Sequence, residues 1–370
     1  MPEARSSSPD TERRPVVVVL GFHRSGTSMV TRMLNLLGVD LGDEAELLEA
    51  VELDNPRGYW EPRWMIDLND ELLAALGTSA FEPFRAAPGW ERSPALEPLR
   101  ERARELLGRH LAGRSRWGWK DPRTSLTLPF WRELIDAPLA CIVCVRSPVE
   151  TVASALRRGL AGIDHARYAE AWLEHTAAAL ANTAPEERML VFYDDVLRDP
   201  SEEMRRVAAF VGVAPSEEQL GGIAASAAPD LRHHTSSAFE VADDQSLPVE
   251  ARALYLLLRS RRDLEQNGTA PPDLLAALER LAPALEAAQR DRTAAEAGAA
   301  RRDDLDRRLR EREAELAERS AQLAACSAQL TERDALLAER DRAIATLLGS
   351  RSWRLTRPLR ELGARTRRGG

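Results

Sequence analysis

The 370-residue sequence predicts a three-layer α/β sandwich built on a parallel sheet, followed by a long C-terminal helix or coiled coil. Two observations lead to this fold class. From residue 15 to about residue 213, short β-branched runs alternate with helical stretches, which is typical of βαβ units. Beyond about residue 300 the composition shifts to Ala, Arg, Glu, Asp and Leu, and leucines recur every seven residues.

Three buried apolar runs are predicted to form the strands of the sheet, and each precedes a helix-start signal. They are Val16–Leu20, Leu139–Val145 and Met189–Tyr193. After the second run, Ser147 and Glu150 are spaced as a capping box around Pro148. After the third run, Asp199 is predicted to cap a helix that ends near Gly212.

The C-terminal third is predicted to be helical. Helices are expected at Pro248–Gln266 and Pro271–Gln289, the second kinked or broken at Pro283. The residues that then recur every seven positions are Leu309, Leu316, Leu323, Leu330, Leu337 and Ile344. The positions three further on are Arg312, Arg319, Cys326, Arg333, Arg340 and Leu347. A self-associating coiled coil and a long, solvated single helix are both compatible with so narrow an apolar stripe.

These patterns divide the chain into five segments. They are a disordered leader at 1–14, an α/β domain at 15–268, a helical linker at 269–300, a coiled coil at 301–348 and a basic tail at 349–370. The last 20 residues hold seven Arg and one Glu. We expect this tail either to contact a partner protein, a glycan or the inner membrane face, or to be solvated.

Composition excludes several classes of protein. Apolar residues make up 44 %, so a large core can form, and the net charge of −8 disfavours a nucleic-acid binder. Three cysteines are too few for a disulfide framework and indicate a reducing compartment. No apolar run is long enough to span a bilayer, and the leader lacks the apolar stretch of a signal peptide. We therefore expect a cytoplasmic protein.

A glycine-rich turn joins the first strand to a helix predicted at Met29–Leu37. Backbone N–H groups at a helix N-terminus, together with the helix dipole, favour phosphate. The candidate binding residues are His23, Arg24, Ser25, Gly26, Thr27 and Ser28. Gly21 and Gly26 have the Walker A spacing of P-loop NTPase-like folds, but Thr27 stands where an NTPase has lysine. The alternative is a tight turn that binds nothing.

A second anion site is predicted at the end of the second strand. Arg146 ends that strand, and Ser154 lies eight residues later in the following helix. A guanidinium group and a hydroxyl suit a phosphate monoester. Because parallel strands present their C-terminal ends at one edge of a sheet, both sites are expected in one crevice. The expected ligand is a nucleotide phosphorylated at two positions.

These motifs, in this order, resemble the sulfotransferase family, which uses 3′-phosphoadenosine 5′-phosphosulfate (PAPS) as donor. The resemblance covers about residues 15–265, with the loop of the bacterial branch. It implies that the Gly21–Ser28 loop binds the 5′-phosphosulfate and that Arg146 and Ser154 bind the 3′-phosphate. It further implies that Tyr193 lies near the adenine and that no metal takes part. Arg24 stands where the animal branch has lysine.

The single lysine among 51 basic residues, Lys120, is the first catalytic candidate. The family often carries a similar Lys-Asp-Pro element near the sulfonate. By this resemblance Lys120 is predicted to stabilise the transferring group, with Arg24 as a second catalytic cation. The alternative is a surface lysine that precedes a helix capped by Asp121. Arg123 is a further candidate for lining the anion crevice.

Glu61 is the predicted catalytic base. It follows two aromatic residues, Tyr59 and Trp60, which can desolvate a carboxylate and raise its pKa. The family uses either Glu or His as base, so His23 is the second candidate. The alternative is a solvated loop glutamate.

The resulting hypothesis is a sulfotransferase that moves a sulfuryl group from PAPS to a hydroxyl, on a glycan or glycolipid. The carbohydrate part rests on the tail, which resembles segments behind coiled coils in bacterial surface-glycan enzymes. A metal-dependent P-loop kinase of a small molecule and a non-catalytic scaffold in surface-glycan assembly are the alternatives. Metal sites are not predicted: Cys141 and Cys144 face opposite sides of a strand, and His233 and His234 lack further ligands.

Overall fold

The computed structural model describes residues 14–51, 55, 58–111, 114, 116–157, 164–227, 236–358 and 360. The predicted leader up to residue 13, the pair His233 and His234, and the tail from residue 361 lie outside the described residues. The chain divides into two units, residues 1–288 and residues 289–370.

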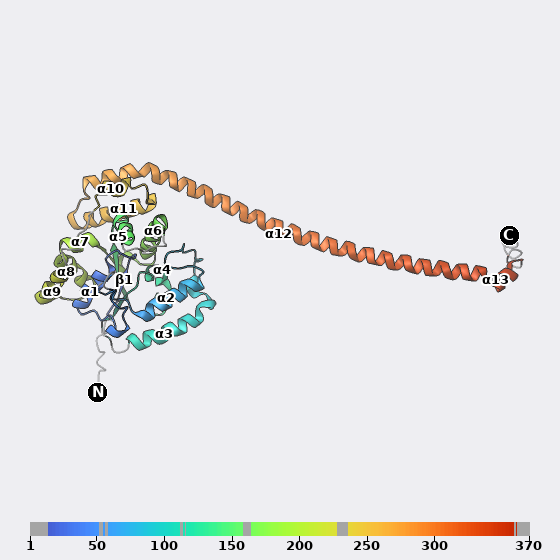
Figure 1. Cartoon of the computed structure of the whole chain (residues 1–370), viewed down its shortest axis with the longest axis horizontal. Coiled ribbons are helices and arrows are strands. Elements are labelled where there is room, and N and C mark those ends of the chain that lie inside the picture. Colours follow the sequence, from blue (N-terminus) through green and yellow to red (C-terminus); the bar gives the residue numbers. More distant parts are fainter. Residues whose placement is uncertain are drawn as a thin grey trace, which may run out of the picture. The chain divides into compact units, whose positions relative to one another are not determined.

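The first unit is built on one parallel four-stranded sheet in the order β2-β1-β3-β4 (Figure 1). Its strands are β1 (Val16–Leu20), β2 (Gly118–Lys120), β3 (Leu139–Val145) and β4 (Arg188–Phe192). The first two predicted strands are confirmed at both ends. The third begins and ends one residue earlier than predicted, because Tyr193 already belongs to α7 (Tyr193–Arg198). Strand β2 was not predicted, because three residues are too few to show a hydrophobic period.

Helices cover both faces of this sheet, which confirms the three-layer prediction (Figure 1). Side chains of β1 alternate between two cores: Val17 and Val19 enter one, while Val16, Val18 and Leu20 enter the other. The first core is closed by α1 (Thr27–Leu36), α8 (Pro200–Phe210) and α9 (Glu217–Ser226). The second is closed by α2 (Arg63–Ala75), α3 (Glu97–Leu111), α4 (Thr124–Arg132), α5 (Pro148–Arg157), α6 (His165–Ala181), α10 (Ala238–Asp243) and α11 (Val249–Asn267).

The two predicted helix caps have different outcomes. Asp199 caps α8 by accepting a hydrogen bond from the Glu202 backbone N–H at 3.0 Å, and Gly212 follows the helix end with φ 71°. The predicted capping box at Ser147 is wrong. The Glu150 carboxylate instead accepts from Arg146 Nε at 3.1 Å, because a charged hydrogen bond to a buried guanidinium is stronger than a neutral cap.

A single helix, α12 (Pro272–Gly349), runs for 78 residues and is followed by α13 (Arg351–Leu355). It begins inside the first unit, where Leu274, Ala277 and Leu281 are buried. The predicted break at Pro283 does not occur. Proline cannot donate a helical hydrogen bond to the carbonyl of Glu279, but Glu279 is an exposed residue, so the missing bond is tolerated.

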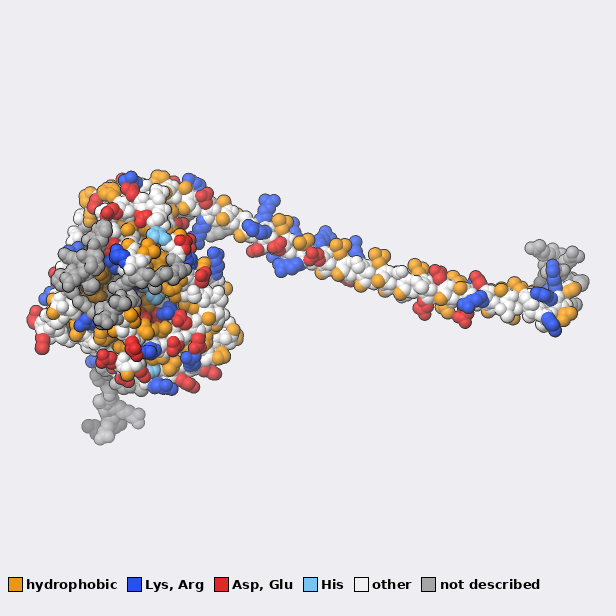
Figure 2. Space-filling model, viewed as in Figure 1, with side chains coloured by type: hydrophobic (Ala, Val, Ile, Leu, Met, Phe, Trp, Pro, Cys, Tyr) orange, Lys and Arg blue, Asp and Glu red, His pale blue; other side chains and the backbone are white. Residues whose placement is uncertain are grey.

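Beyond residue 289, α12 carries charged side chains of both signs between its hydrophobic ones (Figure 2). Glu315 accepts from both Arg312 and Arg319 within the helix. The leucines at seven-residue spacing are exposed in the single chain, Leu323 at 72 %. Within the part of the chain that the structure describes, no helix is both long and apolar enough to cross a membrane.

Candidate active site

The loop Gly21–Ser28 connects β1 to α1 and is confined on two sides. Gly21 has φ 132°, and a Cβ there would lie 2.5 Å from the carbonyl oxygen of Cys144 on β3. Gly26 has φ 85°, and a Cβ there would lie 2.5 Å from Cδ2 of Tyr193. Arg24 also adopts a left-handed backbone, with φ 67°. Glycine is therefore required at both ends of the loop for sterics as well as for backbone freedom.

The loop offers donors to an anion. The Ser25 hydroxyl is buried and has no hydrogen-bond partner within the described part of the chain. The first amides of α1 point out of the helix N-terminus, and its first turn contains no acidic residue. A buried hydroxyl without a partner is unusual in a folded protein and fits a ligand oxygen at this position.

The second predicted anion site adjoins this loop. Arg146 Nη1 donates to the carbonyl oxygen of Arg24 at 3.3 Å, and Arg24 Nε donates to Ser154 Oγ at 3.4 Å. The Arg146 guanidinium lies 4.1 Å from the ring centroid of Tyr193, the residue that also packs on Gly26. The structure thus brings the glycine loop, the strand-end arginine, the helix serine and the tyrosine into one cluster.

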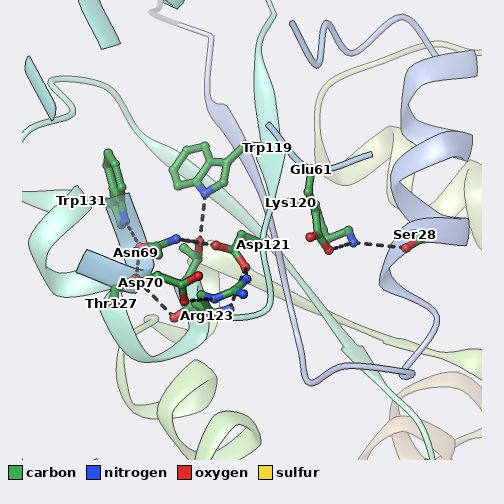
Figure 3. A network of polar contacts seen from close by, with 11 residues as sticks. Ser28, Glu61, Asn69, Asp70, Trp119, Lys120, Asp121, Arg123, Thr127 and Trp131 are labelled. Carbon is green, nitrogen blue, oxygen red and sulfur yellow. Dashed lines mark hydrogen bonds and ion pairs between the residues drawn. The ribbon is translucent and has the colours of Figure 1, made fainter. Parts of the chain in front are cut away.

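Lys120 and Glu61 lie beside the same loop (Figure 3). Lys120 ends β2 and is 1 % exposed, and Glu61 is 6 % exposed, so neither is a surface residue. The Lys120 ammonium contacts the Glu61 carboxylate and donates to Ser28 Oγ at 3.1 Å. Burial raises the pKa of Glu61, and the positive charge of Lys120 opposes this rise.

The backbone holds Glu61 in place just before α2. Its carbonyl oxygen accepts from the Leu48 N–H at 2.7 Å, and the preceding Trp60 has φ 60°. Such a backbone conformation in a bulky residue persists only where the surrounding structure enforces it. The direction of the Glu61 carboxylate is therefore determined by the segment on both sides of it.

A buried polar network follows Lys120 (Figure 3). Asp121 Oδ1 accepts from the Arg123 backbone N–H at 3.1 Å in the turn that leads into α4, so Asp121 satisfies a backbone donor ahead of this helix, as a cap does. It accepts from Asn69 Nδ2 at 2.7 Å and from Arg123 Nη1 at 2.9 Å. Arg123 is held by Asp121 and Asp70, whose charges raise the pKa of Arg123 above its usual range although burial opposes them. Its guanidinium is thus held by two carboxylates, and its role in lining the anion crevice stays a prediction.

Asn69 was missed in the sequence, although a signal was present. It lies on the apolar stripe of α2 with Met65, Leu68 and Leu72, where a polar residue needs partners. Its Oδ1 accepts from Trp131 Nε1 at 2.8 Å and from Thr127 Oγ1 at 2.7 Å.

His23, the second candidate for the base, lies in an aromatic cluster. Its ring stacks on Phe81 with centroids 5.1 Å apart and meets Phe22 edge-on. Its Nε2 is buried and has no hydrogen-bond partner among the described residues. Burial lowers the pKa of His23 well below its usual value, and the neighbouring Arg123 adds to this effect.

Cys141 and Cys144 were not predicted to bind a metal ion. Cys141 packs in one core and Cys144 in the other, so they lie on opposite faces of β3. Burial raises the pKa of both thiols to about 12. Over the residues that the structure describes, no group of three or more His, Cys, Asp or Glu side chains is arranged to hold a metal ion.

Comparison with known proteins gives one family. A model of the sulfotransferase family matches residues 15–217. No curated protein sequence matches the chain.

Solved structures of low sequence identity also align with the chain. Sulfotransferase STF9 from Mycobacterium avium is 17 % identical over 70 % of this chain and 77 % of that one, with a TM-score of 0.37. The sulfotransferase domain of the Synechococcus PCC 7002 olefin synthase is 18 % identical over 76 % and 98 %, with a TM-score of 0.33. Mouse sulfotransferase SULT7A1, complexed with PAP, is 11 % identical over 61 % and 67 %, with a TM-score of 0.32.

Proposed function

The chain belongs to the sulfotransferase family, and on that premise we propose that it transfers a sulfuryl group from PAPS to an acceptor hydroxyl. One observation carries the proposal. Arg146, which follows β3, donates to the backbone of Arg24 in the loop after β1, so two anion-binding elements form one cluster. A donor with phosphate groups on both sides of its ribose requires two such elements close to each other.

Each part of the donor is assigned to residues of this cluster. The glycine loop, with the Ser25 hydroxyl and the α1 N-terminus, takes the 5′-phosphosulfate. Arg146 and Ser154 take the 3′-phosphate, and Tyr193 lies on the adenine side. The cluster carries two guanidinium groups within hydrogen-bond reach of the loop or of Ser154, which suits a polyanion.

The chemistry is assigned to the pair beside the loop. The acceptor hydroxyl loses its proton to the Glu61 carboxylate as the acceptor oxygen forms a bond to sulfur. The bond between sulfur and the bridging oxygen breaks, and 3′,5′-ADP leaves with that electron pair. Lys120 and Arg24 supply the positive charge that metal ions supply in phosphoryl transfer.

The donor assignment is tested by thermal shift with 3′,5′-ADP, 5′-AMP and ATP. The 3′-phosphorylated nucleotide is expected to raise the unfolding temperature most. Arg146→Gln is expected to remove this preference, whereas Arg132→Gln, which breaks an ion pair with Glu187 away from the loop, retains it. Equal shifts for the three nucleotides with the wild-type chain contradict the proposal.

We further propose that α12 self-associates through its repeated leucines. Leu316 and Leu330 are 64 % and 63 % exposed, so a second copy would remove apolar area from water. Sedimentation velocity of the full chain is expected to show an oligomer that Leu316→Glu with Leu330→Glu converts to monomer. A wild-type monomer at tens of micromolar contradicts the proposal and favours a solvated single helix.

A further inference from the structure

We propose that a groove beside Glu61 and Lys120 binds the acceptor, and that the acceptor is a carbohydrate. This inference rests on the proposed function and adds the substrate class. The groove lies between α1 and residues 44–50 and 58–63, and it has a volume of about 840 Å³. This is within the usual size of small-molecule sites, about 300–1,000 Å³.

The first wall of the groove continues from the reaction centre along α1. Ser28, Arg32 and Asn35 are spaced by four and three residues, so they lie on one face of this helix. Ser28 accepts the hydrogen bond from Lys120 (Figure 3), while Arg32 and Asn35 line the groove. The groove therefore begins one helical turn along α1 from Ser28, the residue that the Lys120 ammonium contacts.

The second wall continues from Glu61. Leu48 and Trp60 line the groove, and Leu48 donates its backbone N–H to the carbonyl oxygen of Glu61. Trp60 immediately precedes Glu61 in the chain. An acceptor lying in the groove would thus contact Trp60, the residue before the candidate base, near which its reacting hydroxyl must lie.

The side chains that line the groove match the chemistry of a sugar. The flat indole of Trp60 suits the C–H face of a pyranose ring, and Arg32, Asn35 and Arg63 offer donors to hydroxyls. Arg63 is held in place by Glu49 at 2.8 Å and by the Leu47 carbonyl at 3.2 Å. Among the described residues, half-buried Arg32 has no hydrogen bond or ion pair.

A purely apolar alcohol fits this lining poorly. Such a ligand would cover the guanidinium of Arg32 without replacing its hydrogen bonds to water, which carries a free-energy cost. Leu36, Leu47 and Leu48 supply apolar lining, which suits the C–H groups of a second sugar or of an aglycone.

The test uses the full chain saturated with 3′,5′-ADP and an array of printed neutral and acidic glycans. The wild type is expected to bind at least one glycan, and Arg32→Met is expected to weaken that binding at least tenfold. Trp60→Leu is expected to do the same. Arg205→Met is the matched control, because Arg205 is an exposed helical arginine on α8 that pairs with Glu202.

A parallel thermal shift with 3′,5′-ADP separates this inference from the proposed function. Arg32→Met is expected to retain the wild-type nucleotide shift, which also shows that the variant is folded. If the wild type shifts with the nucleotide but binds no glycan, or if Arg32→Met binds glycan as the wild type does, this inference is overturned and the donor assignment stands. If the wild type shows no nucleotide preference, the proposed function fails, and glycan binding lost in Arg32→Met still supports the groove.

Discussion

The Lys120 ammonium contacts the Glu61 carboxylate inside the protein, although the two residues are 59 positions apart and belong to different elements. Both side chains are almost fully buried, and the same ammonium also bonds Ser28 of the loop. Removing either partner would leave an uncompensated charge inside the protein, which destabilises the fold. The contact also brings the proposed base and the proposed electrophile together.

Glu61→Gln is expected to lower kcat by about 10²-fold or more, because general base catalysis contributes roughly 10² to 10⁴. The variant keeps a hydrogen-bond acceptor for Lys120, so binding of 3′,5′-ADP is expected to change little. Release of 3′,5′-ADP from PAPS in the presence of acceptor measures the rate. Glu71→Gln, at an exposed ion pair with Arg102, is the control, and a Glu61→Gln rate equal to that of the control would exclude Glu61 as base.

The pH dependence of turnover is expected to follow the ionisation of Glu61. The base acts only when deprotonated, so kcat/KM rises with pH through the pKa of this carboxyl. Burial raises that pKa, which moves the rising limb above the ordinary glutamate value of about 4.3. The rise of kcat/KM with pH is measured in the wild type and in Glu61→Gln. If the variant shows the same rise at the same pH, the ionisation belongs to another group.

Gly26→Ala is expected to unfold or strongly destabilise the loop, since the added methyl group would collide with Tyr193. Gly212→Ala is a matched control, because Gly212 has a similar positive φ, 71°, but open space around its Cβ position. The Gly212→Ala control measures the cost of placing alanine in a left-handed backbone conformation alone, about 1–2 kcal/mol. Urea unfolding measures both variants, and a Gly26→Ala cost no larger than that of Gly212→Ala would remove the steric argument.

Asn69→Leu is expected to destabilise the protein by about 3 kcal/mol or more, because it leaves the Trp131 indole N–H without its acceptor and Asp121 Oδ2 without the Asn69 donor. Asn69→Asp keeps the acceptor oxygen but places a second carboxylate against Asp121, so its destabilisation is expected to increase as the pH rises. Urea unfolding at two pH values tests both. An Asn69→Leu variant as stable as the wild type would show that the network contributes nothing.

Acid is expected to destabilise the fold through His175. Burial lowers the pKa of His175 to about 4, against about 6.5 in the unfolded chain. The unfolded state therefore binds the proton more readily, so stability is complete above pH 6.5 and falls by about 3 kcal/mol as the pH drops to about 4. His175→Phe keeps the edge contact with Phe22 and is expected to reduce this acid loss. An unchanged loss in the variant would assign the effect to other groups.

Local patterns were sufficient for most of the sheet and for both anion-binding motifs. The five residues of β1 and the seven of β3 are apolar throughout, which is how strands covered on both faces appear in a sequence. Glycines between β1 and α1, and arginine after β3, lie where parallel strands must end together. The predicted capping box at Ser147 is wrong because Glu150 pairs with the buried guanidinium of Arg146, a contact that the local capping pattern does not predict.

The layered fold and the meeting of the two candidate anion-binding loops could be predicted from the sequence, because apolar strand runs, glycine positions and the direction of parallel strands are local properties. The burial of Lys120 against Glu61, the two carboxylates that hold Arg123 and the groove lined by Trp60 are visible only in the tertiary structure. These contacts join segments that are far apart in the chain, and they depend on which charged side chains are paired when they become buried.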